Sequence, residues 1–400
     1  MTSFIERYHV PEQHFWVRGS RSGPPVEYDA GTGLWSVYGY PELREALNDP
    51  VTFSSDTMRV VPKEMLPESE DFSLSGFLTQ IDPPEHTKLR KLVSSAFTRK
   101  VVADLEPRIA DLTHELLDAA RERGGHLELV TDLAYPLPVT VIAELLGVPS
   151  SDRDLFRQWA NALFERDTQV SLNKSTEEQR QDLQAALTPL KEMTDYLGTH
   201  AAERRRQPRA DLLTRLVEAE VDGERLPDRQ VVNFAMILLL AGHVTTTMLL
   251  GNTVLCLDAF PEQQARARAD RASIPAVIEE SLRFLTPFAA VTRATTREVE
   301  LGGETIPADR LVMLWLGAAN RDPRQFSDPD VFAPGRDPNP HLGFGHGIHF
   351  CLGAPLARLE GRVALNILLD RYDPLRTDPD DPVAFIPTPT MTGVRHLPLR

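Results

Sequence analysis

Residues 343–353 read GFGHGIHFCLG, a glycine-rich stretch with one cysteine, Cys351, directly before a predicted helix that begins near Ala354. Glycines adopt backbone angles that other residues resist, and they let the main chain approach a ligand closely. A helix amino terminus carries partial positive charge, which favours an ionised sulfur. An isolated cysteine is more often a buried, inert thiol. This loop, in contrast, can hold one sulfur rigidly beneath a planar cofactor.

Composition limits the classes of protein that need to be considered. The 400 residues are 42% hydrophobic, enough to bury a large core. Acidic residues outnumber basic ones by 58 to 43, and the net charge of −15 argues against general attraction to nucleic acid or anionic lipid. The only cysteines are Cys256 and Cys351, so a disulfide framework is not expected. Cys256 lies in an apolar helical stretch and is predicted to belong to the core.

No membrane segment is expected. The first ten residues, MTSFIERYHV, contain charges and no long apolar run. The most apolar run, residues 234–242, has about half the roughly 20 residues needed to span a bilayer, and it is interpreted as part of a buried helix. The 32 prolines are spread along the chain without a linker or repeat. We therefore expect a cytoplasmic protein with a single domain over residues 1–400.

Helical periodicity dominates the sequence. Apolar residues recur at three-to-four spacing in residues 84–97, 102–123, 151–164, 176–206, 229–257, 274–284 and 354–372. Strand-like segments are short, at residues 34–38, 298–301 and 311–316. The predicted fold is mainly α with small β-sheets.

The pattern Phe344-x-x-Gly347-x-His349-x-Cys351-x-Gly353 resembles the haem-binding signature of the cytochrome P-450 family, in particular its bacterial, ferredoxin-dependent members. The resemblance implies a helical bundle around haem b, iron protoporphyrin IX. It also implies that Cys351 ligates the iron, that Phe344 packs near the sulfur and that His349 hydrogen-bonds a haem propionate. Thiolate ligation favours cleavage of the O–O bond.

Distant segments resemble the same family. Glu280-Ser281-Leu282-Arg283 is similar to its Glu-x-x-Arg helix, and residues 332–336 are similar to the segment that adds a second arginine, Arg336. The resemblance implies a structural ion network of Glu280, Arg283 and Arg336 behind the cysteine loop. Without that context, Glu280 and Arg283 would be interpreted as a surface pair worth a few tenths of a kcal/mol.

Three further basic residues are implied as haem contacts. His86 and Arg90, one helical turn apart, would reach one propionate, and Arg293 would bind propionate from the other side. Arginine and histidine suit a carboxylate because they donate charge-assisted hydrogen bonds. Taken singly, each residue would be interpreted as a solvated surface charge.

Residues 241–246, AGHVTT, resemble the oxygen-activation motif of the family's central helix. The resemblance implies that the small residue and Gly242 admit haem and dioxygen, and that Thr245 assists proton delivery. The alternative is a threonine bonded to its own helix carbonyl. The family usually has an acid where this chain has Val244, so protons could instead travel through water, a substrate hydroxyl or His243. His243 could also simply line the substrate pocket.

The reductant is expected to be a separate protein, because the chain has no flavin or nicotinamide domain and no cysteine cluster. We expect a ferredoxin and a ferredoxin reductase, acting on a monomer. Basic residues gather in residues 88–100, which contain Lys88, Arg90, Lys91, Arg99 and Lys100. They predict either a solvated helix face or a docking patch for an acidic ferredoxin.

The substrate-contact regions implied by the family are residues 58–80, 163–190, 241–245, 287–292 and 389–391. They are largely apolar, with Phe72 and Leu74 among their residues, and predict a roomy pocket. The candidate pocket residues are Phe77, Leu78, His243, Val291 and Met391.

The chain resembles macrolide-tailoring hydroxylases of the erythromycin C-12 hydroxylase type, especially over residues 86–98 and 238–250. We therefore expect a monooxygenase that hydroxylates or epoxidises a bulky secondary metabolite, a macrolide or related polyketide. The alternatives are oxidation of a nonribosomal peptide or terpenoid, radical coupling or peroxide-driven chemistry, and a non-catalytic haem sensor or ligand-binding protein.

Overall fold

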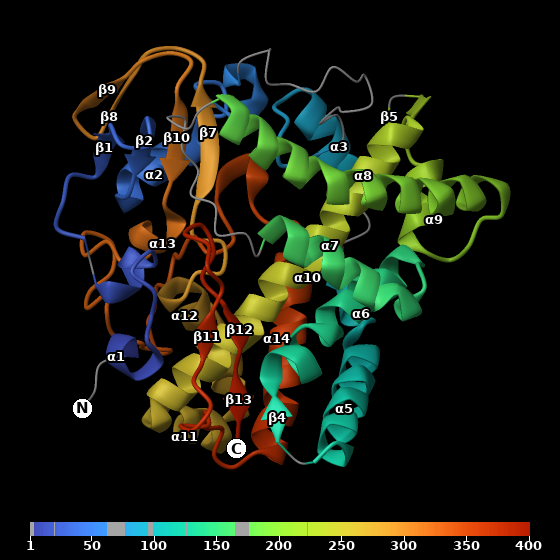
Figure 1. Ribbon diagram of the computed structural model, residues 1–400, viewed down its shortest axis with the longest axis vertical. Coiled ribbons are helices and arrows are strands. Elements are labelled where there is room, and N and C mark those ends of the chain that lie inside the picture. Colours follow the sequence, from blue (N-terminus) through green and yellow to red (C-terminus); the bar gives the residue numbers. More distant parts are fainter. Residues whose placement is uncertain are drawn as a thin grey trace.

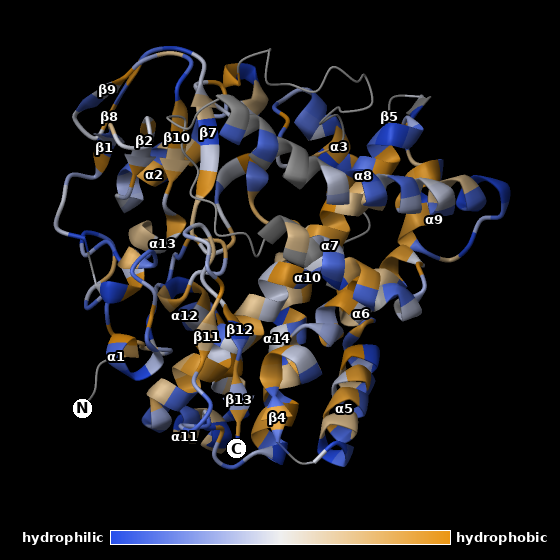
Figure 2. Cartoon of the chain, viewed as in Figure 1, coloured by the Kyte–Doolittle hydropathy of each residue, from blue (hydrophilic) through white to orange (hydrophobic). Residues whose placement is uncertain are grey.

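A computed structural model describes residues 4–19, 21–61, 77–94, 99–124, 126–164, 176–221 and 223–400. Its central element is helix α10 (Asp228–Ala259), which crosses the middle of the molecule (Figure 1). This helix is long and apolar enough to cross a membrane by composition alone, but 72% of its most apolar window is buried inside the molecule. A helix that is apolar all round belongs in a core. Colouring by hydropathy shows the same apolar centre (Figure 2).

The helices with the most extensive contacts to α10 are α6 (Pro136–Leu146), α8 (Thr176–Arg206), α12 (Ile274–Phe284) and α14 (Ala354–Arg371). Helix α6 was not predicted from the sequence. Nearly all of its residues are buried, so the polar face that would show helical periodicity is missing. Its two prolines, Pro136 and Pro138, lie in the first turn, where proline is tolerated.

The remaining α-helices surround this group. They are α1 (Phe4–Tyr8), α2 (Tyr40–Asn48), α3 (Glu85–Ser94), α4 (Arg99–Ala103), α5 (Glu106–Glu122), α7 (Arg153–Phe164), α9 (Leu212–Glu218), α11 (Pro261–Ala269) and α13 (Leu316–Ala319). The helix predicted over residues 102–123 is divided into α4 and α5, and Pro107 lies in the first turn of α5. The other predicted helices are present, with ends that differ by a few residues where the structure describes them.

A five-stranded sheet lies beside the helices, in the order β1-β2-β10-β7-β3. Its strands are β1 (Val26–Asp29), β2 (Leu34–Val37), β3 (Phe53–Ser54), β7 (Val291–Thr295) and β10 (Leu311–Leu314). β10 pairs parallel to β2 and antiparallel to β7, which places Val312 opposite Arg293. The sheet therefore fixes the position of Arg293.

The other strands form short pairs. β4 (Leu127–Glu128) pairs with β13 (Pro398–Leu399), β5 (Glu220–Val221) with β6 (Glu224–Arg225), β8 (Val299–Leu301) with β9 (Glu304–Ile306), and β11 (Ala384–Phe385) with β12 (Val394–His396). The prediction of a mainly α fold with small sheets is confirmed. Cys256 is fully buried in α10, and burial raises the pKa of its thiol, so the prediction of a core cysteine is confirmed as well.

Candidate active site

The cysteine loop is held by its own backbone. The Cys351 N–H donates to the Phe344 carbonyl oxygen at 2.9 Å, and α14 begins three residues later. Gly345 and Gly347 have φ values of 72° and 70°, in the left-handed region that glycine adopts without strain. A Cβ on Gly347 would lie 2.5 Å from the carbonyl oxygen of Leu47 at the end of α2. Glycine at this position therefore allows the loop to contact α2 closely.

The surroundings of Cys351 pull the pKa of its thiol in two directions. Burial raises the pKa and dominates, whereas the Gly353 and Ala354 N–H groups and the charges of Arg90 and Arg358 lower it. The helix amino terminus and the two arginines thus stabilise a negative sulfur without fully offsetting its loss of hydration. A coordinating metal ion deprotonates such a thiol outright. The site is suited to a thiolate that is completed by iron.

Basic side chains from three separate elements converge beside the loop. His86 on α3 and His349 face each other, with ring centroids 4.3 Å apart. Arg90 donates to the Phe350 carbonyl oxygen at 2.7 Å, and Arg293 comes from β7. Ser55, which was not anticipated, lies with its Oγ 2.8 Å from His349 Nε2. The structure therefore brings together the residues expected to contact propionate.

This cluster of basic residues carries an excess of positive groups. Burial and neighbouring cations lower the pKa of His349 to about 3 and also lower that of His86, while burial lowers the pKa of Arg293 to about 10. The carboxylate that opposes these shifts is Asp82, which already accepts hydrogen bonds from Ser54 Oγ and the Ser55 N–H.

Within the described residues, His86 Nε2 is buried without a hydrogen-bond partner. The cations Arg90 and Arg293, with an unpaired ring nitrogen beside them, favour the binding of anions. The cluster therefore fits the two propionate groups of haem.

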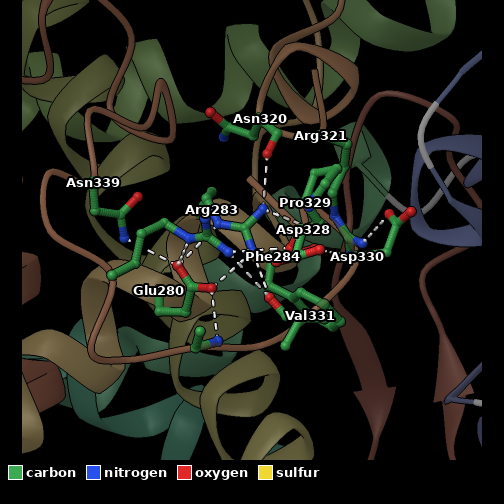
Figure 3. Close-up of polar contacts among 12 residues, drawn as sticks. Glu280, Arg283, Phe284, Asn320, Arg321, Asp328, Pro329, Asp330, Val331 and Asn339 are labelled. Atoms are coloured by element: carbon green, nitrogen blue, oxygen red, sulfur yellow. Dashed lines mark hydrogen bonds and ion pairs between the residues drawn. The ribbon is translucent and has the colours of Figure 1, made fainter. Parts of the chain in front are cut away.

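Behind the loop, Glu280 and Arg283 of α12 form a fully buried ion pair, with Arg283 Nη2 2.7 Å from Glu280 Oε1 (Figure 3). Arg283 also donates to the carbonyl oxygens of Asn320, Pro329 and Val331, at 2.8–2.9 Å. Glu280 accepts from the Ala333 N–H and from Asn339 Nδ2. Arg336 Nε lies 3.5 Å from Glu280 Oε2. The three residues named for the network therefore meet, and backbone carbonyls complete it.

A second charged group beside the loop was missed in the sequence. Arg358 of α14 donates to both carboxylate oxygens of Glu279 at 2.7 Å, and its Cζ lies 4.5 Å from the centre of the Phe344 ring. His341 Nε2 lies 3.0 Å from the same carboxylate. Seventy-nine residues separate Glu279 from Arg358. No motif or periodicity in the sequence indicates a contact between two residues so far apart in the chain.

On α10, one face is accessible within an otherwise buried helix. Ala241 is exposed and Thr245 is half-buried, one turn apart, while Val244 is buried. The Thr245 hydroxyl donates to the Ala241 carbonyl oxygen at 2.8 Å. The structure therefore shows the alternative that the sequence left open, a threonine bonded to its own helix.

Two other residues of this motif make packing contacts. His243 is fully buried, with Nδ1 2.6 Å from the Leu239 carbonyl oxygen and its ring edge-on to Tyr135. It lies two residues from both Ala241 and Thr245, on the opposite side of the helix. Its ring packs inside the molecule, and a place for His243 in the lining of the substrate pocket stays a prediction. A Cβ on Gly242 would lie 3.1 Å from the Ile142 side chain, so this glycine serves the contact between α10 and α6.

The other candidate pocket residues do not form one cluster. Met391 packs with Val244, Met248, Ile386 and Phe288 beside α10, and Phe288 lies in the predicted contact region 287–292. Phe77 and Leu78 belong to the main core, and Val291 packs against the core of the sheet. Residues 62–76 and 165–175, which include Phe72 and Leu74, lie outside the described residues.

Comparisons with known proteins agree with this geometry. The family model for cytochrome P450 matches residues 26–398. The chain belongs to the cytochrome P450 family. It is a monooxygenase that uses haem b, as the family does.

Bacterial tailoring enzymes are among its relatives. Cyclomarin C epoxidase CymV of Salinispora arenicola is 45% identical over 96% of this chain and 94% of its own length. Erythromycin C-12 hydroxylase of Saccharopolyspora erythraea is 45% identical over 96% and 93%. The crystal structure of HmtN, a post-tailoring hydroxylase involved in himastatin biosynthesis, shares 54% identity, covers both chains fully and has a TM-score of 0.86.

Proposed function

We propose that Cys351 is the proximal ligand of haem and that the enzyme oxidises a bulky secondary metabolite held against the Ala241 and Thr245 face of α10. The observation that carries this proposal is the convergence of one buried sulfur at a helix amino terminus with the basic cluster beside it. Haem bound through a thiolate supplies the activation of dioxygen. Because family membership establishes an enzyme, a non-catalytic haem sensor is no longer a candidate.

The protein's own residues have distinct tasks in this proposal. His86, Arg90, Arg293 and His349 bind and orient the propionates. The Glu280 network holds the cysteine loop from behind. Thr245 is the hydroxyl nearest to the accessible face, and its proton is now donated to Ala241 O. Val244 cannot relay a proton, so delivery to Thr245 depends on water or on a substrate hydroxyl.

The first test is the spectrum of the reduced, carbon monoxide-bound protein. We expect the red-shifted Soret band of a thiolate complex in the wild type and its loss in Cys351→Ala. Cys256→Ala is the matched control, because that thiol is fully buried in α10 and away from the loop. A wild type without the band, or a Cys351→Ala variant that retains it, contradicts the ligand assignment.

For the substrate we propose a macrolide or related polyketide. The support is the 45% identity to erythromycin C-12 hydroxylase over nearly the whole chain. A second candidate is the scaffold handled by the himastatin enzymes, because the identity to HmtN is higher, at 54%.

An optical titration separates the two substrate candidates. Macrolides, their aglycones and himastatin-pathway compounds are added to the purified enzyme, and the low-to-high-spin Soret shift is measured. A saturable shift with macrolides supports the first scaffold, and a shift confined to the himastatin compounds replaces it with the second.

We also propose that the enzyme is a cytoplasmic monomer and that a ferredoxin reduces it. Lys88 and Lys91 are exposed on α3, and Lys100 is exposed on α4, while the side chain of Arg99 lies outside the described residues. Arg90 joins α3 directly to the cysteine loop. An acidic ferredoxin on this face would approach the loop with complementary charge. We expect Lys88→Glu with Lys91→Glu to slow ferredoxin reduction at low salt, and an unchanged rate would contradict the docking face.

A further inference from the structure

The group formed by Glu279, Arg358 and Phe344 is separate from the basic cluster of His86, Arg90, Arg293 and His349. Arg358 makes two parallel hydrogen bonds to Glu279, both 2.7 Å long, and a planar guanidinium held in this way cannot rotate freely. Hydrogen bonds from Arg358 and His341 lower the pKa of Glu279 to about 2 despite its burial. The carboxylate therefore remains ionised throughout the neutral range, and the clamp on Arg358 remains in place.

The guanidinium of Arg358 lies against Phe344, which is hydrogen-bonded to Cys351. Its Cζ lies 4.5 Å from the Phe344 ring centre, and the Phe344 carbonyl oxygen accepts the Cys351 N–H. The charge of Arg358 acts on the sulfur, as that of Arg90 does. Arg90 already serves the basic cluster and the Phe350 carbonyl. Arg358 is the arginine on the Phe344 side of the sulfur.

We propose that Arg358, held by Glu279, is a positioning residue that restrains electron donation from the Cys351 thiolate and thereby makes the iron easier to reduce. Reduction adds one electron and therefore one negative charge at the metal, with no bond made or broken. A fixed cation nearby stabilises the added charge, and groups around a ligating sulfur are known to tune redox potential. This inference rests on the proposed ligation of iron by Cys351.

The same helix provides a matched control. Arg362, one turn further along α14, is paired with both oxygens of Glu106 at 3.0 and 2.7 Å. The Arg362 side chain is 38% exposed, against 39% for Arg358. Both pairs line one groove of about 320 Å³. Only Arg358, of the two, contacts the Phe344 ring, so a loss of charge at Arg362 reports the effect of net charge alone.

The experiment compares Arg358→Gln with Arg362→Gln in the haem-loaded enzyme, in a redox buffer of fixed potential. We expect the ferrous-to-ferric ratio to fall on the order of tenfold in Arg358→Gln, the size expected for one partly screened unit charge near the sulfur. In Arg362→Gln the ratio should stay within about twofold of wild type. The C–O stretch of the ferrous carbonyl should move to lower frequency in Arg358→Gln alone, because a freed thiolate donates more charge. Equal effects in the two variants, or none in either, would overturn the proposal.

Conservative variants keep the test decisive if Arg358→Gln does not bind haem. Arg358→Lys preserves the charge but replaces the planar group with a mobile, strongly hydrated ammonium. We expect a fall in the ferrous-to-ferric ratio that is smaller than tenfold and is absent from Arg362→Lys, and equal ratios would overturn the proposal. The thiolate spectrum of the wild type separates the hypothesis that Cys351 ligates the iron from the hypothesis that Arg358 tunes its reduction. If it is absent, the ligand assignment fails, whereas an intact spectrum with no Arg358-specific shift rejects only the role of Arg358.

Discussion

Two sets of buried polar groups, one behind the cysteine loop and one on α10 and α14, differ in whether their polar atoms have hydrogen-bond partners. Behind the loop, Glu280 is fully buried and accepts hydrogen bonds from side chains and a backbone N–H. Glu360 of α14 and His243 of α10 are equally buried, yet Glu360 Oε2 and His243 Nε2 have no hydrogen-bond partner among the described residues. The network behind the loop is thus built to stay charged and rigid. Burial of Glu360 and of His243 disfavours their charged forms instead, so changes in the protonation of these two residues alter stability.

The largest effect is expected from breaking the network. Glu280→Gln removes one partner of a buried ion pair and leaves the Arg283 guanidinium uncompensated, which typically costs about 3–5 kcal/mol. Urea unfolding and haem retention would measure the loss. Asp195→Asn, in the exposed pair with Lys191, is the control and should cost less than about 1 kcal/mol. Equal losses in the two variants would show that the network does not stabilise the loop.

Glu360→Met should have the opposite sign. Burial raises the pKa of Glu360 to about 8, so the folded state holds a proton that the unfolded state has released at neutral pH. Glu360 therefore destabilises the folded wild type least below pH 4.5, and it destabilises the folded state increasingly as the pH rises toward 8. Methionine fills similar space without a polar group, and we expect a gain of about 1–3 kcal/mol at pH 7. The gain should shrink toward pH 4.5, and a gain that does not vary with pH would exclude titration of Glu360 as its source.

His243→Phe tests the second of these buried groups, at acidic pH. Burial lowers the pKa of His243 to about 4, so between about pH 6.5 and pH 4 the unfolded state binds a proton that the folded state does not. Stability is therefore lost as the pH falls through this window. We expect the wild type to lose roughly 0.7 kcal/mol more than the variant between pH 7 and pH 6, in paired urea titrations. His126→Gln, at an exposed position, should retain the wild-type slope.

Thr245→Ala should change stability least, within about 0.5 kcal/mol, because the hydroxyl is bonded only to its own helix and lies on an accessible face. We expect product formed per dioxygen consumed to fall by on the order of tenfold if this hydroxyl assists proton delivery. Thr246→Ala is the matched control, since the Thr246 hydroxyl bonds to Gly242 O and is buried. Unchanged coupling in Thr245→Ala would remove Thr245 from the mechanism.

The sequence predicted those parts of the site whose residues lie close together in the chain. The cysteine loop and the Glu280–Arg283 pair lie within single motifs, and several helices with one polar face were predicted close to their ends, although α2 was not. Helix α6 was missed because burial on all sides removes periodicity. The contacts of Ser55 with His349 and of Glu279 with Arg358 join segments far apart in the chain. Such contacts depend on how elements pack, and no local pattern records them.

The orientation of α10 is the second lesson from the site. The sequence implied ligand contacts for residues 241–245 as a group, and in the structure Ala241 is exposed and Thr245 half-buried, whereas His243 is fully buried. The motif marks this turn of the helix as a predicted ligand contact. It did not specify which side of that turn is buried, because an apolar helix has no polar face to set its rotation.

The contact of Gly242 with Ile142 limits how this enzyme can be adapted to other substrates. A larger residue at 242 would push α10 away from α6, and a central helix cannot tilt without disturbing every helix packed on it. Enlarging the pocket by moving α10 would thus sacrifice stability throughout the molecule. Directed evolution toward a different scaffold should accumulate changes around Phe288 and Met391, while position 242 stays glycine.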